Sequence, residues 1–153
     1  MIAPMSGASE AQAFRDLNVE WITAYFELEQ SDLDLLNDPE RVVIEPGGQV
    51  YLAHCEGKTV GGVALMAYGS GTYKIAKMAV TPEYRGRGIG RQLMMHAVEE
   101  ARALGACKLF LASSRSLVSA IGLYESVGFE RLSPDEWPFP RFARADVFMQ
   151  MSV

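Results

Sequence analysis

The stretch that decides the fold of this 153-residue chain is Ala79-Val80-Thr81-Pro82-Glu83-Tyr84-Arg85-Gly86-Arg87-Gly88-Ile89-Gly90. The apolar run 73–80 leads into it and predicts a strand. Apolar residues then recur along one face from Ile89 until Gly105, which predicts a helix with a glycine stop. The sequence therefore predicts a glycine-rich turn that joins a strand to a long helix.

This turn has the composition of an anion-binding site. A helix start presents unpaired backbone N–H groups and the positive end of a macrodipole worth about half an elementary charge. The glycines leave room for a phosphate at the backbone, and the arginines add charge and donors. These residues are Gly86, Gly88, Gly90, Arg85, Arg87 and Arg91. Alternatively, the glycines only form a tight turn and the arginines are solvated. The coincidence of strand, helix and arginines favours the anion site.

Two other phosphate-binding loops do not fit. The dinucleotide fingerprint G-x-G-x-x-G fails, because its third glycine would fall at Arg91. A P-loop would need Gly-Lys-Ser or Gly-Lys-Thr, which this turn lacks.

The rest of the chain predicts a single α/β or α+β sheet domain. We expect a loose terminus over residues 1–11 and one domain over 12–153. Hydrophobic spacing predicts these elements in order: a helix over 19–28, a short helix capped by Ser31, a hairpin of strands 49–55 and 59–67, strands 73–80 and 107–112, a helix over 117–127 and a last strand over 145–151.

Composition excludes several classes. An apolar fraction of 49% with 22% charged residues is globular, and no apolar run approaches the roughly 20 residues of a membrane span. The net charge of −5 argues against nucleic-acid binding, and we expect a cytoplasmic protein. Cys55 and Cys107 are expected to be reduced core residues, and with only His54 and His96 beside them no metal site is predicted.

Two motifs carry a family resemblance. Ala79-Val80-x-Pro82-x-x-Arg85-Gly86-x-Gly88-Ile89-Gly90 resembles the acetyl-CoA motif of the GNAT superfamily of N-acetyltransferases. Ile121-x-Leu123-Tyr124-x-x-x-Gly128-Phe129 is similar to the family's second signature. The resemblance implies a mixed, mostly antiparallel sheet of about six or seven strands, with helices on both faces and a splayed parallel strand pair that holds CoA. It also implies acetyl transfer to a primary amine by direct attack in a ternary complex.

The resemblance assigns roles to individual residues. The pyrophosphate would lie on the backbone amides from Arg85 to Gly90, with Arg91 beside them. The pantetheine arm would pair with the main chain of Met78, Ala79 and Val80, with Ser114 also facing it. The Met78 N–H would face the thioester oxygen, and Tyr124 would protonate the departing thiolate; its alternative is a core aromatic.

One position departs from the family pattern. Many members carry a glutamate as general base on the strand before the loop, and Lys74 stands there in this chain. Lys74 is read as a plain edge-strand lysine. A water chain, an acceptor that arrives as free amine, or an acid such as Glu27 or Glu45 would then handle the proton, and the sequence does not rank these.

The acceptor side is less determined. Residues 1–72 carry a net charge of −8 and residues 73–153 one of +3. Acids of the first half therefore suggest a cationic acceptor, with a solvated helical surface as the equal alternative; they are Glu27, Glu29, Asp32 and Asp34. We expect a small-molecule or peptide amine as partner, and leave open whether the segment 137–142 is a substrate rim or a homodimer contact. The alternative function is a catalytically weak or inactive acyl-CoA-binding sensory module.

Overall fold

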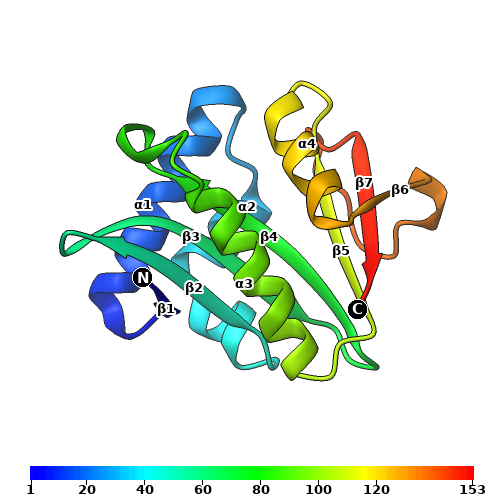
Figure 1. Ribbon diagram of the computed structural model, residues 1–153, viewed down its shortest axis with the longest axis horizontal. Coiled ribbons are helices and arrows are strands. Elements are labelled where there is room, and N and C mark those ends of the chain that lie inside the picture. The colour runs from blue at the N-terminus through cyan, green and yellow to red at the C-terminus, as the bar shows by residue number, and fades with distance from the viewer.

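Seven strands form one twisted sheet in the order β1-β2-β3-β4-β5-β7-β6 (Figure 1). The computed structural model describes residues 1–153. All neighbouring strands are antiparallel except β4 and β5, which confirms the predicted mixed, mostly antiparallel sheet. The strands are β1 (Ile2–Pro4), β2 (Gln49–Cys55), β3 (Lys58–Ala67), β4 (Thr72–Val80), β5 (Lys108–Ser113), β6 (Glu130–Leu132) and β7 (Val147–Ser152).

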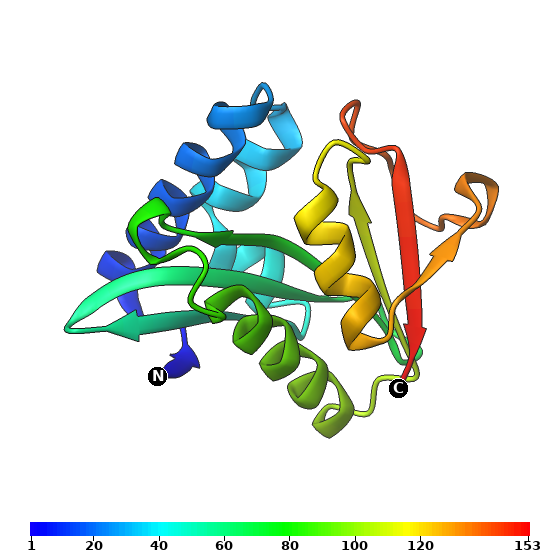
Figure 2. The same cartoon turned by 45° about the horizontal axis from the view of Figure 1, so that its top comes forward.

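Helices cover both faces of the sheet (Figures 1 and 2). The N-terminal pair lies on one face of β3 and β4, and the helix after the glycine-rich turn lies on the other, with the last helix beside it. The helices are α1 (Gly7–Tyr25), α2 (Gln30–Asn37), α3 (Ile89–Ala103) and α4 (Val118–Val127). None of them combines the length and the apolar composition that crossing a bilayer requires.

Two adjacent glycines on β3 let helices approach both faces closely. Successive strand residues point to opposite faces, so Gly61 and Gly62 face different helices. A Cβ on Gly62 would lie 2.8 Å from the Phe14 ring of α1, and one on Gly61 would lie 3.0 Å from Leu93 of α3. Phe14 and Leu93 are themselves fully buried. The centre of the sheet is therefore the place where both layers are most tightly packed.

The parallel pair β4 and β5 separates after a short contact. Its pairing runs only from Thr72↔Lys108 to Lys74↔Phe110, and beyond this point the two strands diverge (Figure 1). A bulge interrupts the opposite edge of β4, where Gly62 pairs with Ala79 and Ala64 with Ala76. Lys77 lies in this bulge with a positive φ of 56°. The result is a β4 segment from Ile75 to Val80 that has no strand on its β5 side.

The observed elements differ from the predicted ones at the N-terminus. The expected loose residues 1–11 form β1, which pairs with β2, and the first turns of α1, which begins at Gly7. A three-residue strand is too short to show an alternating pattern, so the sequence carries no signal for it. Cys107 is exposed just before β5, rather than in the core as expected.

Candidate active site

The glycine-rich turn presents a row of free backbone donors. Gly86 and Gly88 adopt φ of 77° and 81°, and α3 begins directly after Gly88 without a side-chain cap. None of the N–H groups from Gly86 to Arg91 donates a hydrogen bond within the protein; the first that does is Gln92, to the Gly88 oxygen at 3.0 Å. An uncapped helix start with consecutive free N–H groups is a ready anion site.

The three arginines of the turn have no carboxylate partners. Arg85 donates to the Val80 oxygen at 3.2 Å and to the Tyr25 hydroxyl at 3.4 Å. The guanidinium of Arg87 lies 4.6 Å from the Tyr84 ring centre. Arg91 donates to Ser126 Oγ of α4 at 2.7 Å. Their positive charge is therefore not neutralised, although Arg91 is turned toward α4.

Two clefts meet below the turn. The first, here the loop cleft, is lined by the turn itself and by the end of β4, from Met78 to Val80. The second, here the strand cleft, lies between the diverging β4 and β5 and reaches Ser114. The residues common to both clefts are Trp21, Met78 and Tyr124. The other sequence-predicted donor residues thus lie along one continuous path with Met78 and Tyr124 at its midpoint, but Arg87 and Arg91 line neither cleft.

Tyr124 projects from α4 into the junction of the two clefts. It is partly buried against the main core, and burial raises the pKa of its phenol to about 12. The phenol therefore stays protonated at neutral pH and is able to donate a proton. Ser114 is buried at the end of β5, with its Oγ 2.9 Å from Ser116 Oγ.

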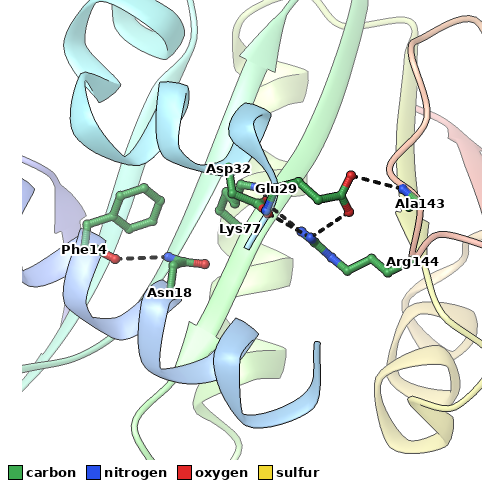
Figure 3. Close-up of polar contacts among 7 residues, drawn as sticks. All are labelled: Phe14, Asn18, Glu29, Asp32, Lys77, Ala143 and Arg144. Atoms are coloured by element: carbon green, nitrogen blue, oxygen red, sulfur yellow. Dashed lines mark hydrogen bonds and ion pairs between the residues drawn. The ribbon is translucent and has the colours of Figure 1, made fainter. Parts of the chain in front are cut away.

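An ion cluster joins two residues that line the strand cleft, Lys77 and Arg144, to acids at the start of α2 (Figure 3). Asp32 has no exposed side-chain surface; it accepts from Lys77 at 2.5 Å and from both Nη atoms of Arg144 at 2.8 and 2.7 Å. Glu29 accepts from Arg144 at 3.2 Å and from the Ala143 N–H at 3.1 Å. This cluster, here the Asp32 cluster, ties α2 to the β4 bulge and to the segment before β7.

The start of α2 explains why Asp32 is held in place. The helix begins at a capping box formed by Glu29 and Asp32, so Glu29, and not the expected Ser31, is the N-cap. Burial raises the pKa of Asp32, but hydrogen bonds from Arg144 and Lys77 and the Lys77 charge outweigh it and lower the pKa to about 2. Asp32 is therefore an anion at every physiological pH.

The acids expected beside the acceptor do not line either cleft. Asp32 and Glu29 are held by cations, and Asp34 is exposed and accepts from Gln30 at 2.9 Å. Neither Glu27 nor Glu45 lines a cleft. Two aromatic residues of the segment 137–142, Trp137 and Phe142, line the strand cleft. This position is compatible with the substrate rim, which was one of the two roles considered for the segment.

Sequence reasoning missed the cationic side of the strand cleft. Lys77 and Arg144 line it, and Arg144 reaches Asp32 across 112 positions of sequence. No local pattern signals such a contact, because it exists only once the chain is folded. Lys74 also lines this cleft, and it lies on a central strand between β3 and β5 rather than on the expected edge.

Comparison with known families assigns this arrangement. A model of the acetyltransferase (GNAT) domain matches residues 46–131, which include the hairpin, the turn, α3, β5 and α4. This chain belongs to the GNAT acetyltransferase family. No group of three or more His, Cys, Asp or Glu side chains is placed to hold a metal ion.

Relatives and solved structures agree with GNAT membership. An uncharacterized N-acetyltransferase of Escherichia coli, YjgM, is 33% identical over 100 residues, and the match spans 63% of this chain but only 60% of that protein. YvbK of Bacillus subtilis, also an uncharacterized N-acetyltransferase, is 29% identical over 76% of this chain and 77% of its own length. A GNAT acetyltransferase from Staphylococcus aureus has the same fold, with a TM-score of 0.90, 20% identity and 99% of both chains covered.

One structural relative was solved with CoA. This Bacillus subtilis acetyltransferase superposes with a TM-score of 0.73 at 20% identity, over 99% of this chain and 97% of that chain. At this identity the likeness concerns the fold. The GNAT family itself indicates an acyl-CoA donor.

Proposed function

We propose that this protein is an N-acetyltransferase that moves an acetyl group from acetyl-CoA to a primary amine by direct attack within a ternary complex. The observation that carries the proposal is the row of free N–H groups from Gly86 to Arg91, at the mouth of a cleft that leads to Tyr124. A pyrophosphate is the anion that such a row suits best in a GNAT protein.

The donor is proposed to lie along the loop cleft. Its pyrophosphate accepts hydrogen bonds from the free N–H groups of Gly86 to Gly90, and Arg85, Arg87 and Arg91 supply positive charge. The Arg85 N–H, which we expected to join this row, instead donates to the Pro82 oxygen at 3.3 Å. The pantetheine arm runs along the β5-facing edge of β4, where main-chain groups of Met78, Ala79 and Val80 pair with its amides as an added strand would. Ser114 bounds the arm from the β5 side.

The transfer is proposed to occur where the clefts meet. The amine lone pair attacks the thioester carbon, and the carbonyl electron pair moves to oxygen, where the Met78 N–H stabilises the charge. Collapse of the tetrahedral intermediate breaks the C–S bond, the thiolate takes the proton of the Tyr124 hydroxyl, and Tyr124 regains a proton from water. Positioning of both reactants supplies the rest of the rate enhancement, without a covalent acyl-enzyme.

The proton of the acceptor has no carboxylate to receive it in either cleft. No Asp or Glu side chain lines them. We therefore propose that the acceptor reacts as a free amine and that its proton passes to water. Of the routes considered from the sequence, proton transfer to Glu27 or Glu45 is the less favoured.

The acceptor itself is proposed to be a small-molecule or peptide amine. The [ribosomal protein bS18]-alanine N-acetyltransferase of Salmonella typhimurium is 42% identical over 52 residues, which is 34% of this chain and 35% of that enzyme. This short match supports N-acetylation of an amine and does not select a peptide over a small molecule.

A turnover screen tests the proposal. Thiol release from acetyl-CoA is measured over amino acids, polyamines, aminoglycosides and peptide N-termini, and CoA binding is measured separately by calorimetry. We expect saturable turnover with at least one class of amine. CoA binding with no turnover for any amine would instead assign the acyl-CoA-binding sensory module, and absence of CoA binding would overturn both.

A further inference from the structure

The strand cleft offers hydrogen-bond donors and cations but no anion. Among its twenty lining residues none is Asp or Glu, and three are cationic: Lys74, Lys77 and Arg144. This is the reverse of the surface that a polyamine or another purely cationic acceptor requires, because like charges in a partly dehydrated cleft repel.

Two of the three cations are already neutralised within the protein. Lys77 and Arg144 are paired with Asp32, and Arg144 also contacts Glu29 (Figure 3). The two carboxylates therefore balance these two cations within the Asp32 cluster. Lys77 and Arg144 therefore stabilise the fold and exert little net electrostatic attraction on an acceptor.

Lys74 is the cation without an anionic partner. It is the last residue of β4 that pairs with β5, so it lies at the closed end of the strand cleft. Its ammonium lies 5.6 Å from the Tyr68 ring centre and 5.1 Å from that of Phe139, and it makes no hydrogen bond or ion pair. Burial and the nearby Lys77 charge lower its pKa to about 8.

Trp137 lines the same cleft, but its indole Nε1 is itself buried. The indole Nε1 of Trp137 is the one buried side-chain nitrogen or oxygen without a hydrogen-bond partner, and Trp137 is 8% exposed. Buried polar groups are normally paired, so the Lys74 ammonium, which has only aromatic rings as partners, lacks a hydrogen-bond acceptor. A carboxylate supplies charge and acceptor oxygens together.

We infer that the acceptor amine also carries a carboxylate, and that Lys74 binds this carboxylate while the amine reaches the thioester beside Met78. This inference deepens the proposed function and rests on it. Lys74 precedes Met78 by four residues of β4, with the Lys77 bulge between them. An amino acid or a short peptide with a free carboxylate is therefore the class of acceptor, and the distance between its amine and its carboxylate decides the fit.

Matched acceptor pairs test the charge requirement. Each pair exchanges a carboxylate for a carboxamide, and kcat/KM is expressed per free amine because the exchange also lowers the pKa of the amine: glycine and glycinamide, β-alanine and β-alaninamide, γ-aminobutyrate and its amide, L-phenylalanine and L-phenylalaninamide. In the wild type we expect kcat/KM to be roughly tenfold or more higher for the carboxylate member of at least one pair. A preference for the amide member in every pair would overturn the inference.

Variants of Lys74 separate anion binding from proton transfer. Lys74→Met should remove the preference for the carboxylate mainly through KM, whereas Lys74→Arg keeps the charge and should retain it. Lys58→Met, in the exposed hairpin, is the matched control and should change neither. If Lys74→Met lowered kcat equally for both members of a pair and left the preference intact, Lys74 would act on the proton and the inference would fall.

Equilibrium binding makes failure of the inference distinguishable from failure of the proposed function. Calorimetric titration of the same carboxylates into the CoA-bound protein should give binding that Lys74→Met abolishes. Lys74-dependent binding without any turnover would keep the inference and overturn acetyl transfer. Turnover of neutral amines without carboxylate binding would keep acetyl transfer and overturn the inference. Absence of turnover together with absence of carboxylate binding would overturn the proposed function and the inference.

Discussion

The loop cleft and the strand cleft are built from different parts of the chain. The loop cleft is lined mainly by one stretch of the chain, from Met78 to Gly90, and this stretch carries the free N–H groups of the turn. The strand cleft is formed by side chains from α1, β4, β5 and the segment 137–145. A donor common to a whole family is suited to main-chain recognition, which tolerates changes of side chain. Selectivity for an acceptor requires particular side chains, and these come from distant segments held by buried ion pairs.

The largest expected effect comes from breaking the Asp32 cluster. Asp32→Asn leaves Lys77 buried without an anion and Arg144 with Glu29 alone, and removing one partner of a buried ion pair costs about 3–5 kcal/mol. We expect the free energy of unfolding to fall by this amount in urea denaturation, while the CoA affinity of the folded fraction changes little. Asp34→Asn, on the exposed face of the same helix, is the control and should stay within about 0.5 kcal/mol. Equal stability of both variants would show that the cluster does not hold the strand cleft.

The same contrast explains how much the sequence could predict. The hairpin, β4, the turn and α3 follow from local patterns, and the structure places them within one or two residues of the predicted bounds. The conformation of the turn could be predicted because glycines at 86 and 88 mark positions with positive φ, and the assignment of this turn to the donor stays a proposal. The Asp32 cluster could not be predicted, because its carboxylates resemble any solvated helical acid until Arg144 is brought to them by the fold.

The second effect concerns the point where the two clefts meet. Tyr124→Phe removes the proposed proton donor for the thiolate, and loss of a positioned general acid should lower kcat by about a hundredfold. CoA affinity should be unchanged in calorimetry, because the ring is kept. Burial raises the pKa of Tyr124 to about 12, so the wild type should lose no activity through Tyr124 ionisation until the pH approaches that value.

Tyr84→Phe provides the matched control for the Tyr124 variant. Tyr84 also lines the loop cleft, but it lies outside the strand cleft and its hydroxyl makes no hydrogen bond. We expect its kcat to stay close to the wild-type value. A similar loss of kcat in both variants, or no loss in Tyr124→Phe, would show that Tyr124 is not the proton donor.

A third and smaller effect appears in acid. Hydrogen bonds and the Lys77 charge lower the pKa of Asp32 from 3.8 to about 2 despite its burial. The unfolded chain therefore binds this proton at a higher pH than the folded chain, so the stabilisation is complete above pH 4 and is lost as pH falls toward 2. This contribution amounts to about 2 kcal/mol, at 1.36 kcal/mol per pKa unit.

The Asp32→Asn variant isolates this contribution. Asparagine does not titrate, so the stability difference between the wild type and the variant reports Asp32 alone. Urea unfolding at a series of pH values should show this difference shrinking between pH 4 and pH 2. A difference that stayed constant over this interval would contradict the lowered pKa.

The smallest effect separates anion binding from backbone strain in the loop cleft. Gly88 and Gly57 share a left-handed backbone, with φ of 81° and 77°, and a Cβ on either would meet no protein atom within 4 Å. Valine at either site should therefore cost a similar strain, about 1–3 kcal/mol of stability. Only Gly88→Val alters the row of N–H groups at the start of α3, so only this variant should weaken CoA binding, by about tenfold in Kd, or 1.4 kcal/mol. Calorimetric titration with CoA measures this change in Kd.

Gly57→Val is the matched control, because Gly57 lies in the β2–β3 hairpin and lines neither cleft. Equal CoA affinity in the two variants would show that the turn does not bind the phosphates. A loss confined to Gly88→Val would mean that donor binding depends on the backbone of this turn, in contrast to the side-chain selectivity proposed for the strand cleft.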